Sequence, residues 1–186
     1  MPKNKPDIVP ELIDAKIIAK TKVFSIEQMQ LRFANGRQVE YERLLGSPQG
    51  AVLIVPLLDE DTVLLIREYA AGMQRYELAL PKGAVDNGEH VLQAANRELM
   101  EETGYGAHNL RQLKSLSVSP GYLNHLSHVV LAQDLYEKRL PGDEPEPIEV
   151  IPWKLTELEQ LLNHEECTEA RSIAALFMVR YHILRP

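Results

Sequence analysis

Several features are scarce in this chain of 186 residues, and each scarcity excludes a class of protein. The single cysteine, Cys167, cannot form an internal disulfide, which is typical of a reducing compartment. No apolar run is long enough to span a membrane, and the first residues lack the apolar core of a signal peptide. These absences predict a cytoplasmic protein that does not use a membrane as a partner.

Positive charge is also in short supply. The chain has 20 Lys and Arg residues against 27 Asp and Glu residues, which gives a net charge of −7. Proteins that bind a nucleic-acid backbone use clustered Lys and Arg, so no nucleic-acid partner is expected. A small phosphorylated substrate remains compatible with this charge, because bound metal ions can screen the repulsion.

Apolar residues are present in the proportion and pattern of a mixed α/β domain. Alternating residues predict β structure from Lys16 to Phe33, and Asn35-Gly36 is a two-residue hairpin signal before a returning strand, Gln38–Leu44. Helix and strand periodicities in the rest of the chain predict a mixed sheet between helices. The further strands are expected at Ala51–Leu58, Thr62–Arg67, Tyr76–Leu80, Leu113–Val118 and Leu126–Gln133, and the later helices at Leu155–Asn163 and Glu169–Leu184.

The segment Gly83–Tyr105 contains the strongest chemical signal. Glu98, Glu101 and Glu102 are spaced i, i+3 and i+4, so they are neighbours on one face of a helix that should end at Gly104. Two carboxylates about 5 Å apart repel by roughly 3 kcal/mol at an effective dielectric constant near 20. Clustered oxygen ligands suit Mg²⁺ or Mn²⁺ better than zinc, so a bound cation is predicted. The alternative is a solvated acidic helix face.

The spacing within this segment resembles the Nudix box. Gly83, Glu89 and the run Arg97–Tyr105 match the signature of the Nudix hydrolase family at every fixed position, and flanking segments resemble its ADP-compound hydrolase branch. This resemblance implies an α/β fold, with a mixed β-sheet in an α/β/α sandwich and an N-terminal antiparallel hairpin. It also implies an N-terminal β-strand segment, residues 1–45, that forms a homodimer, and a hydrolase domain, residues 46–186.

The same resemblance assigns roles within the box. Glu101 is either a metal ligand or the catalytic base, and Arg97 orients Glu101 or another acid. The residues expected to hold the metal are Glu98, Glu102, Glu101 and Glu89, together with the backbone carbonyl of Lys82.

The segment Leu140–Pro147 is proline-rich and acidic, which predicts an irregular exposed loop. Similarity to ADP-ribose hydrolases places Glu144 and Glu146 at the positions of the base and of a further metal ligand, in an order that the sequence leaves open. The alternative is a solvated acidic loop without a catalytic role.

The resemblance also implies substrate contacts from Arg67, Glu77, Tyr122 and Gly83. Two of these residues have a structural alternative. Glu77 could instead pair with Arg75 or Arg67, and Tyr122 could stack on adenine or simply pack at the rim of the site.

Together, these features predict Mg²⁺- or Mn²⁺-dependent hydrolysis of the pyrophosphate bond in small nucleotides that contain ADP. The expected substrates are ADP-ribose, diadenosine polyphosphates and NADH, and AMP is the expected product. Two alternatives stay open: a Nudix pyrophosphatase acting on another nucleoside diphosphate derivative or on (d)NTPs, and a noncatalytic ligand sensor.

Overall fold

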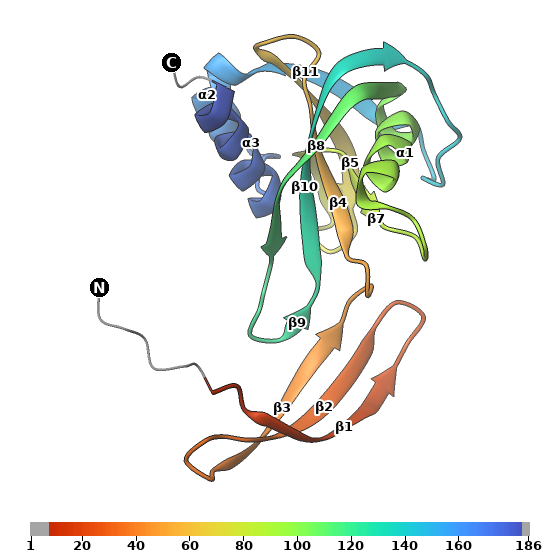
Figure 1. Ribbon diagram of the computed structural model, residues 1–186. Coiled ribbons are helices and arrows are strands. Elements are labelled where there is room, and N and C mark those ends of the chain that lie inside the picture. The colour runs from red at the N-terminus through yellow and green to blue at the C-terminus, as the bar shows by residue number, and fades with distance from the viewer. Residues whose placement is uncertain (1–7, 184–186) are drawn as a thin grey trace, which may run out of the picture. The chain divides into compact units, whose positions relative to one another are not determined.

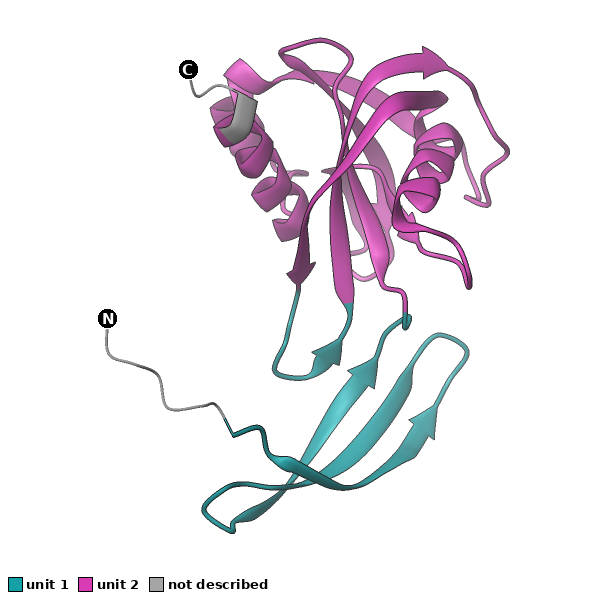
Figure 2. Cartoon of the chain, viewed as in Figure 1, with its two compact units in different colours: residues 1–48, 118–125 teal, residues 49–117, 126–186 magenta. Residues whose placement is uncertain are grey.

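The structure is a computed structural model that describes residues 8–183, with side chains as far as Tyr181 (Figure 1). The chain divides into two compact units (Figure 2). Unit 1 comprises residues 1–48 and 118–125, and unit 2 comprises residues 49–117 and 126–186. None of the helices in the described part is long and apolar enough to cross a membrane.

Unit 1 is a four-stranded sheet in the order β1-β2-β3-β9. Its strands are β1 (Glu11–Lys20), β2 (Ser25–Arg32), β3 (Gln38–Leu45) and the short β9 (Leu123–Asn124). β2 and β3 pair antiparallel, which confirms the predicted hairpin. Its loop is one residue longer than predicted, because Phe33 N–H donates to the Arg37 carbonyl across residues 34–36 and Gly36 adopts a φ of 82°.

The β region predicted from Lys16 to Phe33 is two strands rather than one. β1 begins five residues earlier, at Glu11, and a turn separates it from β2. The Thr21 side-chain oxygen accepts hydrogen bonds from the N–H groups of Val23 and Phe24, at 3.3 and 2.9 Å. Phe24 therefore lies in a turn and is exposed, which the alternating pattern did not predict.

Unit 2 contains a mixed four-stranded sheet in the order β7-β4-β10-β8. Its strands are β4 (Ala51–Pro56), β7 (Lys82–Ala84), β8 (Tyr105–Ser117) and β10 (Leu126–Glu137). β10 runs parallel to β4, and the other pairs are antiparallel. A second sheet, ordered β11-β5-β6, contains β5 (Thr62–Ala70), β6 (Arg75–Ala79) and β11 (Glu149–Lys154).

Helices cover both sides of the unit 2 sheets (Figure 1). α1 (Val91–Thr103) packs on the side to which Val52 and Ile54 of β4 point. The alternate residues, Leu53 and Val55, belong to a second core cluster with the C-terminal helices. The predicted α/β/α sandwich is therefore confirmed. The remaining helical elements are the 3-10 helix η1 (Leu155–Glu157), α2 (Leu158–Leu162) and α3 (Ala170–Ile183).

The other differences from the sequence prediction are in element limits. β8 begins at Tyr105 and β10 continues to Glu137, so both strands are longer than predicted, and the predicted helix at 155–163 is divided between η1 and α2. β11 was not predicted; it follows the proline-rich loop and itself contains Pro152. The predicted end of α3 at Leu184 lies outside the described residues. The segment 138–148 has no helix or strand, which confirms the predicted irregular loop.

Candidate functional site

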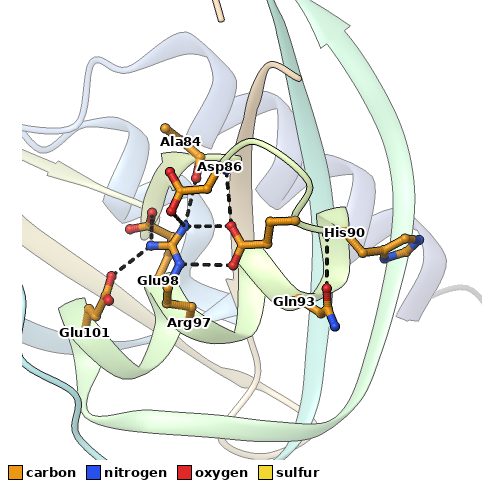
Figure 3. Close-up of polar contacts among 8 residues, drawn as sticks. Ala84, Asp86, His90, Gln93, Arg97, Glu98 and Glu101 are labelled. Atoms are coloured by element: carbon orange, nitrogen blue, oxygen red, sulfur yellow. Dashed lines mark hydrogen bonds and ion pairs between the residues drawn. The ribbon is translucent and has the colours of Figure 1, made fainter. Parts of the chain in front are cut away.

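The position of α1 is set at both of its ends. His90 caps the N-terminus, since its Nδ1 accepts from Leu92 N–H at 3.3 Å and its own N–H donates to Gln93 Oε1 at 3.1 Å (Figure 3). At the other end, Gly104 adopts a φ of 80°, which confirms the predicted left-handed stop. Between these caps, Glu98, Glu101 and Glu102 share one edge of the helix.

An acidic cleft of about 690 Å³ lies along that edge. The three glutamates of α1 face side chains from β5 and from the loop 138–148. Its lining includes Glu68, Lys82, Gly83, Asp86, Arg97, Glu98, Glu101, Glu102, Gly142, Asp143 and Glu144. The cleft therefore brings together carboxylates from four separate segments of unit 2, namely β5, the loop after β7, α1 and the loop 138–148.

Arg97 is the centre of a charge network beside the cleft (Figure 3). Its guanidinium donates to both oxygens of Glu89, at 3.1 and 3.0 Å, to Glu98 at 2.7 Å and to Glu101 at 3.0 Å. It also donates to the carbonyl of Ala84 at 3.0 Å. The bond from Arg97 lowers the pKa of Glu89, and Glu89 is not part of the cleft lining. Arg97 thus orients the box carboxylates.

Burial raises the pKa of two of the box carboxyl groups. Burial raises the pKa of Glu102 to about 8, and its carboxylate accepts one hydrogen bond from the Lys82 backbone N–H at 2.8 Å. Burial also raises the pKa of Glu98, and the negative charges of Glu101 and Glu144 act in the same direction. A nearby cation would favour the charged form of both groups.

Gly83 allows the Glu98 carboxylate to lie directly against β7. A Cβ atom at position 83 would lie 1.9 Å from the carboxyl carbon of Glu98. Any other residue type would displace that carboxylate from its place beside the strand.

This set of donors suits a hard divalent cation. The cleft combines carboxylate oxygens with the backbone of β7, and it has no thiol or imidazole ligand among its lining residues. In the described part of the chain, no three side chains of His, Cys, Asp or Glu converge in the arrangement of a metal site. Here Arg97 binds one oxygen each of Glu98 and Glu101. The lining residues therefore provide the oxygen ligands that such a metal needs. In this structure, two of those carboxylates are bound to Arg97.

The two candidate glutamates of the late loop take different positions. Glu144 lines the acidic cleft and folds over Gly142, where a Cβ atom would lie 2.2 Å from its Oε2. Glu146 instead accepts a hydrogen bond from the Tyr76 hydroxyl at 2.7 Å and lines a smaller cavity of about 220 Å³. Glu144 is therefore the one that joins the box carboxylates.

The predicted substrate contacts within unit 2 do not line a single cavity. Gly83 lines the acidic cleft, whereas Glu77 lines a neighbouring cavity of about 460 Å³. Glu77 is 8% exposed and pairs with Arg75 at 2.7 Å, which is the structural alternative that the sequence left open. Arg67 donates two hydrogen bonds to Glu166, at 2.8 and 2.7 Å. Tyr122 is exposed and belongs to unit 1.

Sequence reasoning missed Glu68. Its carboxylate pairs with Lys82 Nζ at 2.8 Å, lines the acidic cleft, and contributes to the raised pKa of Glu102. Glu68 follows a run of buried residues in β5, and no spacing in the sequence relates it to the box glutamates of α1. The tertiary fold brings Glu68 to the box glutamates, because it places β5 beside Lys82 of β7.

Comparisons with known proteins agree with this geometry. A sequence model described as the NUDIX domain matches residues 47–177, and a model of the NudE-type Nudix hydrolase N-terminal domain matches residues 10–43. The chain is 45% identical over 171 residues to ADP compounds hydrolase NudE of Escherichia coli (strain K12), covering 92% of this chain and 91% of that protein.

Two further proteins are similar to this chain along most of its length. ADP-ribose pyrophosphatase of Bacillus subtilis (strain 168) is 30% identical over 173 residues, covering 88% of this chain and 91% of that protein. A crystal structure of an ADP compounds hydrolase superposes with a TM-score of 0.89 at 43% identity, covering 97% of both chains.

Proposed function

The chain belongs to the Nudix hydrolase family, and from that membership we propose that it hydrolyses the pyrophosphate bond of ADP-containing compounds and releases AMP. The substrates that we propose are ADP-ribose, diadenosine polyphosphates and NADH. The observation that carries this proposal is the convergence of Glu98, Glu101, Glu102 and Glu144 on one cleft. Similarity along most of the chain to an ADP compounds hydrolase and an ADP-ribose pyrophosphatase supports the choice of substrate.

Nudix hydrolases generally depend on a divalent metal, and we propose Mg²⁺, or Mn²⁺ in its place, for this chain. Glu98 and Glu102 would hold it, with Glu101 and the Lys82 carbonyl as further ligands. When bound, such an ion neutralises the diphosphate and lowers the pKa of a coordinated water. Arg97 keeps Glu98 and Glu101 oriented toward the cleft, as its hydrogen bonds of 2.7 and 3.0 Å support.

For the catalytic base we propose Glu144 rather than Glu146. Its carboxylate would take the proton of the water that attacks phosphorus, while the P–O bond to the leaving group breaks and AMP is released. The support is its position on the cleft, near enough to Glu98 for its charge to raise the pKa of that group. Glu101 is the alternative base within the box, and its hydrogen bond to Arg97 favours a role as ligand or orienting group.

We further propose that the N-terminal segment, residues 1–45, forms a homodimer, with residues 46–186 as the hydrolase domain. β1 is an edge strand of its sheet and is exposed along its whole length. It presents Leu12, Ile13, Ile17 and Ile18 to solvent, and an exposed apolar edge strand is stabilised by a partner. Light scattering that gives the mass of one chain, 21.1 kDa, would contradict the dimer.

The experiment that tests the proposed activity is product analysis after incubation with ADP-ribose, diadenosine triphosphate, NADH and a dNTP. Each substrate is supplied with Mg²⁺ and, separately, with EDTA. AMP that forms only with Mg²⁺ supports the proposal. Pyrophosphate from the dNTP alone would replace it with a nucleoside triphosphate pyrophosphatase. Saturable ADP-ribose binding without any product would replace it with a noncatalytic sensor.

A further inference from the structure

The ring of Tyr76 in β6 packs against two neighbouring side chains. The Arg67 guanidinium lies over the ring, 4.3 Å from its centroid, and is itself fixed by the two hydrogen bonds to Glu166. The ring of Tyr69 meets it edge-on, with the centroids 5.6 Å apart. The direction of the Tyr76 hydroxyl is therefore set by β5, β6 and the turn that precedes α3.

That hydroxyl ties the middle of the loop 138–148 to the body of unit 2. It donates to Glu146 at 2.7 Å, and this bond raises the pKa of Tyr76. The ends of the loop are tied separately: Leu140 N–H donates to the Met100 carbonyl at 3.2 Å, and Glu149 pairs with Arg67 at the start of β11. The bond from Tyr76 acts on the segment between those ends, which has no helix or strand of its own.

The consequence concerns which glutamate reaches the acidic cleft. Glu144 and Glu146 are two residues apart in the same loop, and their side chains have the same length and charge. Both glutamates border the smaller cavity, but with Glu146 bound to Tyr76 only Glu144 also lines the acidic cleft, together with Glu98. Both glutamates are followed by a proline, and the bond from Tyr76 is made by Glu146 alone.

We propose that Tyr76 is a positioning residue, which binds Glu146 so that Glu144 is the loop carboxylate presented to the acidic cleft. Its effect on turnover rests on the proposed function, in which Glu144 accepts a proton. Its effect on the order of the loop does not, and can be measured in the protein without substrate or metal.

The kinetic test removes the hydroxyl and keeps the ring. Tyr76→Phe should lower kcat for ADP-ribose about tenfold, because the lost hydrogen bond involves a charged acceptor, and should change KM by less than about twofold. Glu146→Ala should have the same effect, and the double variant should be no worse than either single one. Glu146→Gln should retain more activity than Glu146→Ala, since an amide oxygen can still accept the bond.

The matched control is Tyr136→Phe, which removes a hydroxyl from β10 at a site where the ring packs on His108. It should leave kcat unchanged. Effects of Tyr76→Phe and Glu146→Ala that multiply in the double variant would overturn the proposal. So would a loss for Glu146→Gln as large as that for Glu146→Ala, because the charge of Glu146 would then serve catalysis itself.

Amide hydrogen exchange separates this proposal from the proposed function. In metal-free protein, the backbone N–H groups of residues 142–148, which exclude Pro145 and Pro147, should exchange faster in Tyr76→Phe and in Glu146→Ala than in the wild type or Tyr136→Phe. Equal exchange in all four would overturn the positioning role. If the wild type hydrolyses no ADP compound, the proposed function fails, and the exchange result still decides whether Tyr76 orders the loop.

Discussion

Two acidic regions of unit 2 shift the pKa values of their carboxyl groups in opposite directions. In the turn between β4 and β5, Asp59 accepts hydrogen bonds from the N–H groups of Asp61 and Thr62 and from the Thr62 hydroxyl, at 2.7–2.8 Å. These bonds, first of all the one from the hydroxyl, lower the pKa of Asp59 to about 2. In the cleft, burial instead raises the pKa of Glu98, and it raises that of Glu102 to about 8.

The difference teaches how to tell a structural acid from a functional one. The aspartates of the turn accept their hydrogen bonds from other residues of the protein. Asp59 binds residues of its own turn, and Asp61 accepts two bonds from Thr156, each of 2.9 Å. They need no further partner. The glutamates of the cleft are removed from water with only part of their charge balanced, by Arg97 and Lys82. A carboxylate in that condition is stabilised by a cation from outside the chain.

The comparison is tested most strongly by Glu102→Gln, which replaces the most deeply buried carboxyl group of the cleft. We expect kcat/KM for ADP-ribose with Mg²⁺ to fall by about 100-fold or more, because a direct ligand should cost at least as much as its supporting groups do. Added Mg²⁺ should raise the melting temperature of the wild type and not that of the variant. The measurements are steady-state kinetics and thermal unfolding with Mg²⁺ or EDTA.

Asp59→Asn is the control for this variant, because it also removes one carboxylate charge from unit 2. It should keep both the activity and the rise in melting temperature with Mg²⁺. An equal loss of the Mg²⁺ effect in the two variants would show that net charge, and not the cleft, governs metal binding.

Gly83→Ala sharpens the comparison by disturbing a carboxylate without removing it. The new Cβ would lie 1.9 Å from the Glu98 carboxyl carbon, which is the flexible end of its side chain and can move away. We expect the apparent affinity for Mg²⁺ to fall about tenfold. The free energy of unfolding in EDTA should change by less than about 1 kcal/mol. Activity measured against Mg²⁺ concentration tests the expected loss of affinity. Urea denaturation in EDTA tests the expected stability.

Gly72→Ala provides the reference for that substitution. Gly72 lies in the turn between β5 and β6, and a Cβ atom added there would have no neighbour within 4 Å. It should change neither Mg²⁺ affinity nor stability appreciably. If Gly83→Ala lowered the free energy of unfolding as much as a substitution in the core does, the backbone of β7, rather than the position of Glu98, would be what requires the glycine.

The parts of this site that sequence could predict are those with local causes. The spacing of Glu98, Glu101 and Glu102 needs only the helical repeat, and the end of α1 at Gly104 needs only the left-handed conformation that glycine allows. The partnership of Arg97 with Glu101 was predictable for the same reason, since they are four residues apart. Each of these features depends on residues within one or two turns of helix.

The parts that could not be predicted depend on partners distant in the chain. The first half of β8 contains Gly106 and Asn109 and has little strand propensity, and its pairing with β10 makes it a strand. Glu68 reaches the cleft because Lys82, fourteen residues later, pairs with it. The choice between Glu144 and Glu146 depends on Tyr76, seventy residues before the latter.

The smallest expected effect is on stability, from Asp59→Asn. The folded pKa of about 2 lies below the usual 3.8, so the charged Asp59 stabilises the fold above pH 3.8, and this contribution is lost as the pH falls toward 2. The variant should therefore unfold at lower urea concentration than the wild type at pH 7, and the difference should shrink below pH 4. Urea denaturation at pH 7, 5, 4 and 3 measures it. A difference that grows as the pH falls would mean that the hydrogen bonds of the turn do not favour the charged form, and the contrast with Glu102 would lose its physical basis.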